Sequence, residues 1–320
     1  MSEAAIRKAL VRAARWEAED IIAFVLEDEA GGLLPTWSPG AHIDVVLPSG
    51  LVRQYSLCGD PSDLRRYEIA VLHERAGRGG SRELHETQLV GASLQWRGPR
   101  NNFELTPAKS YLLIAGGVGV TPIITMAEAL TRAGAGWRMM YGVRSRAALC
   151  FADRLRDLGA GVQIVSEAEE GRPNFEGFLR GAGAETAIYC CGPEGMIAAV
   201  DVARQRAAPE AILNVEHFAP PAAAAPPPGQ AGEDFEIVLR KSGKTLRVAA
   251  SATILETLRS AGLELTTSCE TGVCGACETA VWEGRPDHRD CILSPQERAE
   301  GKTMMICVSR SLSPVLVLDI

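Results

Sequence analysis

Four cysteines near the C-terminus carry the most specific chemistry in this chain. Cys269, Cys274 and Cys277 lie in the run CETGVCGAC, and Cys307 follows after 29 intervening residues. The spacing C-x₄-C-x₂-C with a distant fourth Cys is the plant-type ligand arrangement of a [2Fe–2S] cluster, which moves single electrons. Two glycines lie between these ligands, and they allow the positive φ angles that a tight wrap around the irons requires.

Zinc and disulfides are the alternative uses of these thiols. Zinc ribbons usually carry two C-x₂-C knuckles, and only Cys274 and Cys277 have that spacing. A disulfide framework is disfavoured because the nine cysteines are odd in number and clustered, and because no secretory signal opens the chain. Cys291 lies between Cys277 and Cys307 and is interpreted as an incidental thiol.

Composition limits the class of partner. The 320 residues are enough for two or three domains. A net charge of −7 argues against nucleic acid, because phosphate binding needs a basic face. No apolar run reaches the ~18 residues of a membrane span, and the charged N-terminus has no apolar signal core, so we expect a cytoplasmic protein without membrane contact. The five histidines have no ligand-like spacing, so no oxygenase site is expected here.

The C-terminal part of the chain is predicted to form a separate module. Residues 219–232, APPAAAAPPPGQAG, have the Pro and Ala content of a semi-extended linker. For residues 233–320 we predict a small β-grasp ferredoxin fold, with a helix at 254–261 and strands at 235–239, 245–248, 278–282, 303–308 and 314–318.

The first 218 residues divide again near Pro107. Short β-rich runs over residues 1–106 predict an antiparallel β-barrel, with strands at 21–27, 42–47, 53–57, 67–72 and 93–98. Strands alternate with helices over residues 107–218, which is typical of a doubly wound α/β domain with a parallel sheet. Its strands are expected at 111–115, 137–143, 161–165 and 187–191, and its first helix at 123–133.

A glycine-rich turn in the α/β segment predicts a nucleotide site. In the run IAGGVGVTPI, Gly116, Gly117 and Gly119 would let a phosphate approach the backbone at a helix N-terminus. We expect Thr121 to cap that helix and Pro122 to occupy its first position. A glycine turn also occurs as a plain connection between elements, and this one departs from G-x-G-x-x-G.

A second run favours a nicotinamide pocket at the same sheet edge. In YCCGPE, Cys191 ends a predicted strand directly before Gly192 and Pro193, and ligands of open α/β sheets bind at that edge. The alternative for Cys191 is a buried thiol without a ligand. Arg144 and Arg146 follow another strand of the sheet, where a 2′-phosphate would suit them.

The barrel segment contains a strand suited to a ligand with a phosphate and a planar ring. The run RQYSL puts Arg53, Tyr55 and Leu57 on one face and Ser56 on the other. The alternative is an ordinary half-buried strand with a surface Arg. The run GRGGSR at 77–82 is typical of a backbone anion nest, or alternatively of a flexible hairpin turn.

Together these motifs resemble the phthalate dioxygenase reductase family, which includes the vanillate O-demethylase reductases. The resemblance covers nearly the whole chain and rests on RQYSL, GRGGS, GGVGVTP, YCCGP, VEHF and the cysteine loop. It implies an oxidoreductase in which NADH reduces FMN, and FMN passes electrons singly to the [2Fe–2S] cluster. It also implies the domain order flavin barrel, NAD domain and plant-type ferredoxin.

The resemblance assigns roles to the matching residues. Arg53 and Ser81 would lie near the FMN phosphate, and Tyr55 beside the isoalloxazine. Two residues are expected to be catalytic, Ser56 within reach of flavin N5 and Cys191 near the nicotinamide. The expected FMN-binding set is Arg53, Gln54, Tyr55, Ser56, Leu57, Gly79, Gly80, Ser81 and Phe218, which would cover the ring. The expected NADH-binding set is Gly116, Gly117, Gly119, Thr121, Pro122, Arg144, Cys191, Gly192 and Pro193.

The implied partner is a Rieske-type terminal oxygenase acting on an aromatic acid or methyl ether. The same electron path could end at a cytochrome P450 or another acceptor. A protein of another class, a one-electron carrier that binds a nucleotide only to regulate docking, is a further alternative. NADH follows from the family, whereas Arg144 and Arg146 would favour NADPH. The linker is compatible with a ferredoxin module that swings and with one that stays docked.

Overall fold

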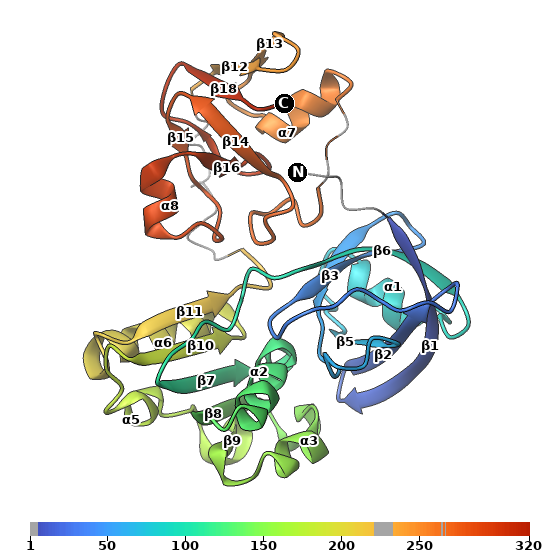
Figure 1. Ribbon diagram of the computed structural model, residues 1–320, viewed down its shortest axis with the longest axis vertical. Coiled ribbons are helices and arrows are strands. Elements are labelled where there is room, and N and C mark those ends of the chain that lie inside the picture. Colours follow the sequence, from blue (N-terminus) through green and yellow to red (C-terminus); the bar gives the residue numbers. More distant parts are fainter. Residues whose placement is uncertain (1–5, 221–232, 264, 266) are drawn as a thin grey trace. The chain divides into compact units, whose positions relative to one another are not determined.

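The computed structural model describes residues 6–220, 233–263, 265 and 267–320 (Figure 1). The chain forms two compact units, Met1–Phe218 and Ala219–Ile320. Most of the predicted linker at 219–232 lies outside the described residues. No helix in the described ranges is long and apolar enough to cross a membrane.

The first part of unit 1 is an antiparallel barrel. Its sheet order is β4 (Val52–Ser56), β3 (His42–Val46), β6 (Ser93–Arg100), β1 (Arg7–Ala18), β2 (Ile21–Asp28) and β5 (Tyr67–Leu72). A bridge between Leu57 and Ile69 joins the two end strands and closes the barrel. Helix α1 (Gly80–Glu86) follows β5, and its buried Leu84 packs into the barrel core with Ile43 and Trp96.

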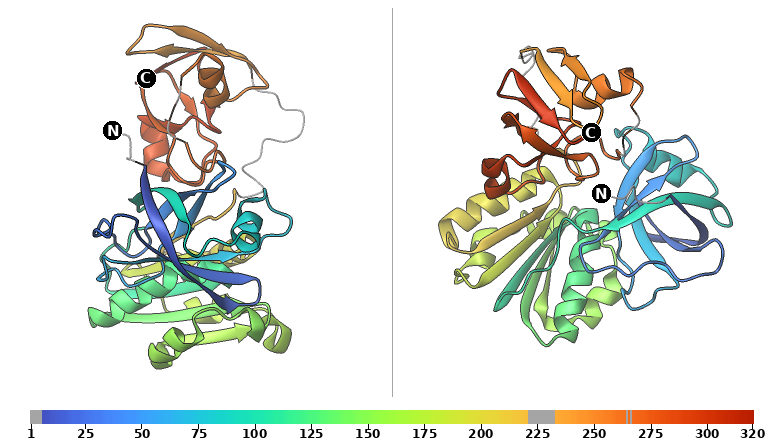
Figure 2. Two further views of the ribbon diagram at one scale, coloured as in Figure 1. Left: turned by 90° about the vertical axis from the view of Figure 1, so that its right-hand side faces the viewer. Right: turned by 45° about the horizontal axis from the view of Figure 1, so that its top comes forward.

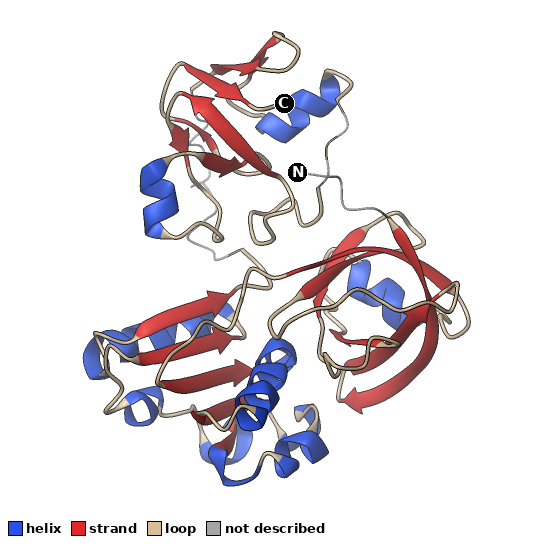
Figure 3. Ribbon diagram, in the orientation of Figure 1, coloured by secondary structure: helices blue, strands red, loops and turns tan. Residues whose placement is uncertain are grey.

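The second part of unit 1 is a five-stranded parallel sheet. Its order is β11 (Ile212–Glu216), β10 (Thr186–Cys191), β7 (Ser110–Gly116), β8 (Gly136–Val143) and β9 (Val162–Ser166). Helices cover both faces of this sheet (Figure 3). One face is covered by α2 (Val120–Arg132) and α3 (Ala152–Asp157), and the other face is covered by α5 (Phe175–Leu179) and α6 (Glu194–Ala207). Central strand β7 alternates between the two cores, Leu113 on one side and Ile114 on the other.

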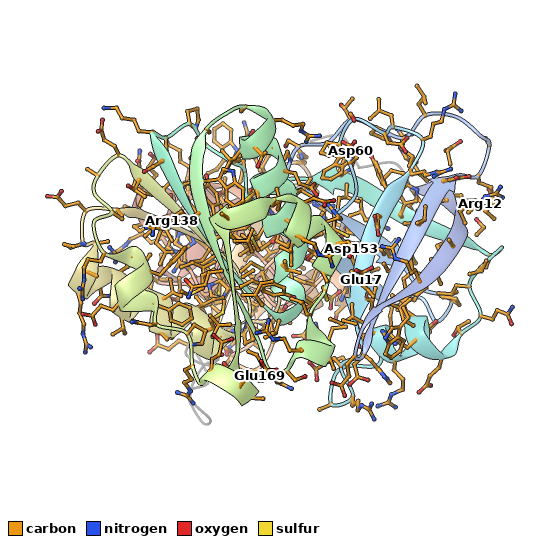
Figure 4. All side chains as sticks on the ribbon, turned by 90° about the horizontal axis from the view of Figure 1, so that it is seen from below. Arg12, Glu17, Asp60, Arg138, Asp153 and Glu169 are labelled. Carbon is orange, nitrogen blue, oxygen red and sulfur yellow. The ribbon has the colours of Figure 1, made fainter. Side chains whose placement is uncertain are left out.

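The barrel and the parallel sheet share a packed seam. Phe151 N donates to Glu17 Oε1 at 2.9 Å, and Arg154 Nη1 donates to the carbonyl of Cys58 at 2.6 Å. Asp60 accepts from Arg132 at 3.2 Å. Figure 4 labels Glu17 and Asp60, two of the carboxylates that the barrel contributes to this seam. These contacts, over a shared apolar core, hold the two folds together as one compact unit.

Unit 2 is a β-grasp fold (Figure 2). Its mixed sheet has the order β13 (Thr245–Val248), β12 (Phe235–Leu239), β18 (Val315–Leu318), β14 (Glu278–Glu283) and β16 (Thr303–Met305), with β12 and β18 parallel. Helix α7 (Ile254–Ser260) packs on it and begins at a capping box of Thr253 and Glu256. A short ladder of β15 (Pro286–Asp287) and β17 (Arg310–Ser311) and helix α8 (Pro295–Glu300) complete the unit.

Several predicted elements differ from the structure. Strand β1 was not expected, because its burial alternates irregularly around two register shifts. The segment expected to be an anion nest or a hairpin turn contains helix α1 from Gly80 onward. The strand predicted at 303–308 ends at Met305, so Cys307 lies in the turn that follows. Strand β11 and helices α3, α5 and α6 were also not predicted.

Candidate redox and nucleotide sites

The four predicted cluster ligands converge in unit 2. Cys269, Cys274 and Cys277 lie in the loop between α7 and β14, and Cys307 follows β16. Strands β14 and β16 pair through Glu278 and Met305, and this pairing brings the neighbouring Cys277 and Cys307 together. Three of the four thiols are buried, and Cys269 is partly exposed.

The four sulfurs form two pairs. Cys269 pairs with Cys274, and Cys277 pairs with Cys307. Interaction with the Cys274 thiol is the main reason that the pKa of Cys269 is lowered to about 5, which favours its thiolate. A [2Fe–2S] cluster takes four thiolates, two on each iron, so this donor set fits it. Within the described residues, no group of three or more His, Cys, Asp or Glu side chains is placed to hold a single metal ion.

The loop backbone also suits a cluster. The N–H groups of Thr271 and Ala276 donate to the sulfurs of Cys269 and Cys274, each at 3.4 Å. Gly272 has a φ of +76°, and a Cβ there would lie 2.8 Å from Val308 Cγ2. Glycine therefore allows both the left-handed turn and the close packing of this loop, while the N–H donors stabilise negative sulfur.

The glycine turn after β7 packs directly on the turn after β10. A Cβ on Gly119 would lie 2.4 Å from the carbonyl oxygen of Cys191, and a Cβ on Gly116 would lie 2.5 Å from Met196 Sδ. A Cβ on Gly192 would also meet close neighbours, since it would lie 3.0 Å from the Cα atom of Gly116. Because β7 and β10 are parallel neighbours, both turns lie at the carboxyl edge of the sheet, where nucleotides bind such folds.

The helix cap predicted at this turn is wrong. Helix α2 begins at Val120 with Gly119 as its N-cap, and no side chain caps it. Thr121 is buried inside the first turn, where its hydroxyl donates to the carbonyl of Val118 at 2.9 Å. Pro122 accordingly occupies the third helical position rather than the first. The signal was misjudged because a 3₁₀ turn over Gly117–Gly119 leads continuously into the helix.

Cys191 lies at the sheet edge beside a carboxyl group that the sequence did not reveal. Its thiol is fully buried and donates to Glu216 Oε2 over 4.0 Å, from the paired end of β11. Burial raises the pKa of Glu216 to about 8 and that of Cys191 well above its usual range. Both groups are therefore largely protonated at neutral pH.

Phe218, two residues beyond β11, is 44% exposed. Pro193 is the N-cap of α6.

The two arginines after β8 differ in their environment. Arg146 forms ion pairs with Glu169 at 3.1 Å and Glu170 at 3.4 Å. Arg144 is exposed, and its carbonyl accepts from Ala168 N at 3.1 Å. Two carboxylates already engage Arg146, which reduces its availability for a 2′-phosphate and weakens the argument for NADPH.

Strand β4 and the GRGGS segment come together in the barrel. Arg53 Nη2 donates to the carbonyl of Arg78 at 2.9 Å, and a Cβ on Gly80 would lie 2.5 Å from Arg53 Nε. Gly79 has a φ of +87° at the N-cap of α1. Ser81 Oγ accepts from Glu74 N at 3.0 Å, which holds the loop in place. The guanidinium therefore lies among backbone groups of the run predicted to bind a phosphate.

The other residues of the RQYSL strand divide between its two faces. Tyr55 packs against the barrel core, Leu57 is fully buried, and burial raises the pKa of the Tyr55 phenol. Ser56 is 6% exposed on the opposite face with Gln54, which donates to Asp44 Oδ1 at 3.0 Å. The sequence analysis missed Asp44 and its partners because the contact depends on strand pairing.

Comparisons with known proteins agree with this geometry. A 2Fe-2S iron-sulfur cluster binding domain matches residues 237–312, and an oxidoreductase NAD-binding domain matches residues 113–201. The phenoxybenzoate dioxygenase subunit beta of Ectopseudomonas oleovorans is 40% identical, over 97% of this chain and 96% of its own. The vanillate O-demethylase oxidoreductase of Pseudomonas putida is also 40% identical, over 95% of this chain and 96% of its own length.

Solved structures extend the likeness over the whole chain. Phthalate dioxygenase reductase, described as a modular structure for electron transfer from pyridine nucleotides to [2Fe-2S], has a TM-score of 0.71, 33% identity and 98% coverage of both chains. An intact type IV self-sufficient cytochrome P450 monooxygenase has a TM-score of 0.92 and 42% identity over 98% of this chain. The present chain spans 41% of that longer protein.

Fold and sites define a pyridine-nucleotide oxidoreductase with a [2Fe–2S] domain. Within that class, the chain belongs to the phthalate dioxygenase reductase family. The family resemblance, the three folds and the oxidoreductase class expected from the sequence are confirmed.

Proposed function

We propose that this protein is the reductase component of a multicomponent oxygenase. In it, electrons pass from NADH through FMN and the [2Fe–2S] cluster to a separate Rieske-type oxygenase. The observation that carries the proposal is the two-by-two pairing of Cys269, Cys274, Cys277 and Cys307 in a chain that also has a nucleotide turn. The dioxygenase and O-demethylase names of full-length relatives support the kind of partner.

The proposed division of labour follows the predicted domains: an FMN barrel at 1–106, an NAD domain at 107–218, a linker at 219–232 and a ferredoxin at 233–320. The flavin, when bound, accepts a hydride and releases its two electrons one at a time. The residues of the chain bind and orient the reactants. We also propose a cytoplasmic location, because a reducing compartment preserves the thiolates that a [2Fe–2S] cluster needs as ligands.

On the flavin side, Arg53 and Ser81 are the proposed phosphate ligands. Arg53 reaches the backbone of the GRGGS run, so its charge is directed toward the loop that would hold the anion. Ser56 and Tyr55 are proposed to border the isoalloxazine from adjacent positions of β4, and Phe218 to cover it. Gln54, Leu57, Gly79 and Gly80 complete the proposed set and shape the strand and loop.

On the nucleotide side, the turn 116–119 and helix α2 are proposed to hold the NADH pyrophosphate. The N-terminal N–H groups of this 13-residue helix favour an anion. Thr121, Pro122, Gly192, Pro193 and Arg144 are proposed to line the same site. Cys191 is proposed to lie near the nicotinamide, which must approach flavin N5 to about 3–3.5 Å for hydride transfer. Its protonated thiol adds no negative charge there.

The test is turnover with purified protein supplied with FMN, iron and sulfide. We expect a yellow-brown protein that reduces cytochrome c with NADH. The variant Cys274→Ser is the matched control, because it should retain flavin and NADH oxidation while losing electron delivery through iron. A colourless protein, or one without NADH turnover, would contradict the proposal and favour a zinc adaptor or a simple electron carrier.

A cytochrome P450 is the second candidate acceptor. The observation that favours it is the TM-score of 0.92 to the type IV self-sufficient P450 monooxygenase, higher than that to phthalate dioxygenase reductase. Reconstitution with a purified Rieske oxygenase and with a purified P450, compared at equal concentration, distinguishes the two acceptors by which one supports NADH-dependent substrate oxidation.

A further inference from the structure

An ion pair fastens the first turn of the cysteine loop to helix α7. Arg259, in the last turn of α7, donates from Nη2 to Glu270 Oε1 at 2.6 Å and from Nη1 to Glu270 Oε2 at 3.2 Å. Two guanidinium nitrogens therefore engage both oxygens of one carboxylate, which is the arrangement in which an arginine fixes its partner's orientation best. Leu255 and Leu258 bury α7 in the core of unit 2, so the arginine extends from a firmly packed helix.

Thr267 joins the same network from the start of the loop. Its hydroxyl accepts from Arg259 Nη2 at 2.8 Å and donates to Glu270 Oε1 at 3.0 Å. Thr267 is buried, whereas the side chains of Arg259 and Glu270 are 39% and 42% exposed. An isolated exposed ion pair contributes little, but a buried hydroxyl that links both charged groups makes the three side chains hold one another in place.

The network supports an unfavourable backbone conformation. Glu270 has a φ of +56°, in the left-handed region that residues with a Cβ rarely adopt. It lies directly between Cys269 and Thr271, and the Thr271 N–H donates to Cys269 Sγ at 3.4 Å. Such a conformation persists where the surrounding structure holds it. The left-handed turn at Glu270 therefore determines the direction of an N–H donor to a cluster ligand.

We propose that Arg259 is a positioning residue for the [2Fe–2S] cluster. Through Glu270 it holds the turn that directs the Thr271 N–H at Cys269, and this raises the reduction potential of the cluster. The inference rests on the proposed function, in which the four cysteines bind the cluster. Reduction makes the cluster more negative, and hydrogen bonds to its sulfurs stabilise that form. The network therefore favours electron transfer from flavin to iron.

A purely electrostatic role is the alternative to positioning. If the two side chains acted through their charges alone, loss of Arg259 would lower the potential and loss of Glu270 would raise it, each independently of the other. Positioning predicts that the two effects depend on each other, because Arg259 acts on the turn through Glu270. A double-mutant cycle measures that dependence.

The test is the cycle of Arg259→Gln and Glu270→Gly, read as the midpoint potential of the cluster in the FMN-loaded protein. Glycine adopts a positive φ without support, so Glu270→Gly removes the need for the ion pair. We expect Arg259→Gln alone to lower the potential by about 59 mV, a tenfold change in the equilibrium of a one-electron carrier. In the Glu270→Gly background, the same substitution should cause a clearly smaller shift.

Two further variants leave the charges in place. Thr267→Val removes the shared hydroxyl, and Arg259→Lys keeps the positive charge but loses the planar fork. Both should lower the potential. The matched control is Arg247→Gln, at an arginine that donates twice to Asp234 Oδ2, at 2.9 and 2.6 Å. Arg247 lies on β13, at the opposite end of the sheet from β16, so its loss should leave the potential unchanged.

The outcomes separate the two accounts. An equal shift of Arg259→Gln in both backgrounds, or an unchanged potential in both Thr267→Val and Arg259→Lys, would overturn the positioning role. The two charge-preserving variants decide the question if Arg259→Gln does not fold or does not retain its cluster. Failure of the unmodified protein to bind a cluster would instead overturn the proposed function.

Discussion

Replacing Gly119 by Ala should weaken NADH binding while leaving both prosthetic groups in place. The added Cβ would lie 2.4 Å from the carbonyl oxygen and 2.6 Å from the carbonyl carbon of Cys191. These are backbone atoms, so the clash is relieved only if the turn after β7 moves away from the turn after β10. The two turns form the proposed nucleotide edge, and that displacement changes the surface that NADH must contact.

The size of the effect follows from the cost of overpacking. Inserting a methyl group where backbone must shift typically costs about 1–3 kcal/mol. The free protein relieves the strain by opening the turn, and NADH must restore the original geometry on binding, so the cost enters the dissociation constant. At about 1.4 kcal/mol for each factor of ten, the Kd for NADH should rise about 5- to 150-fold.

The assay is NADH titration of the FMN-loaded protein, with absorbance of flavin and cluster as internal controls. The matched control is Gly136→Ala at the start of β8, where an added Cβ meets no atom within 4 Å. We expect the Kd of that variant to equal that of the unmodified protein. A folded Gly119→Ala protein with unchanged NADH affinity would refute the assignment of the two packed turns to the nucleotide.

Four further substitutions test the other parts of the account. Cys274→Ser should abolish the visible absorption of the cluster and preserve NADH-dependent flavin reduction; persistent cluster spectra would refute its ligand role. Arg53→Ala should lower FMN retention at least about tenfold, as expected for loss of a charged phosphate contact, and equal occupancy after dialysis would count against it. Cys191→Ala should slow hydride transfer without loss of flavin, and an unchanged rate would make the thiol purely structural. Burial raises the pKa of Glu216 to about 8, so the folded protein favours the protonated carboxyl group. The contribution of this proton to folding stability is complete below about pH 4.5 and is lost as the pH rises through 8. Glu216→Gln should remove that pH dependence of the melting temperature, and an identical pH profile would contradict the shift.

The sequence predicted features that depend on local pattern. Strands 235–239 and 245–248 were placed at their observed bounds, because alternating apolar residues and turn residues mark them. The spacing of Cys269, Cys274 and Cys277 indicated their convergence, since a short loop constrains its own ligands. In the same way, the glycine run located the turn that connects β7 to α2.

Features that depend on pairing between distant segments could not be predicted. The contact between Gly119 and Cys191 exists because β7 and β10 are neighbours in the sheet, an order that no local pattern encodes. For the same reason, Glu216 beside Cys191 and Asp44 opposite Gln54 appear only once the register is known. The helix start at Val120 was misplaced because the continuous 3₁₀ turn removes the need for a capping side chain.

The most direct test of the account is an anaerobic NADH titration of the full chain supplied with FMN, iron and sulfide. It is followed by visible absorbance and low-temperature electron paramagnetic resonance. We predict that NADH bleaches the flavin and that the reduced [2Fe–2S] signal then appears, and that Cys307→Ser retains only the flavin response. A protein that binds both groups but whose iron stays oxidised with excess NADH would contradict the proposed electron path.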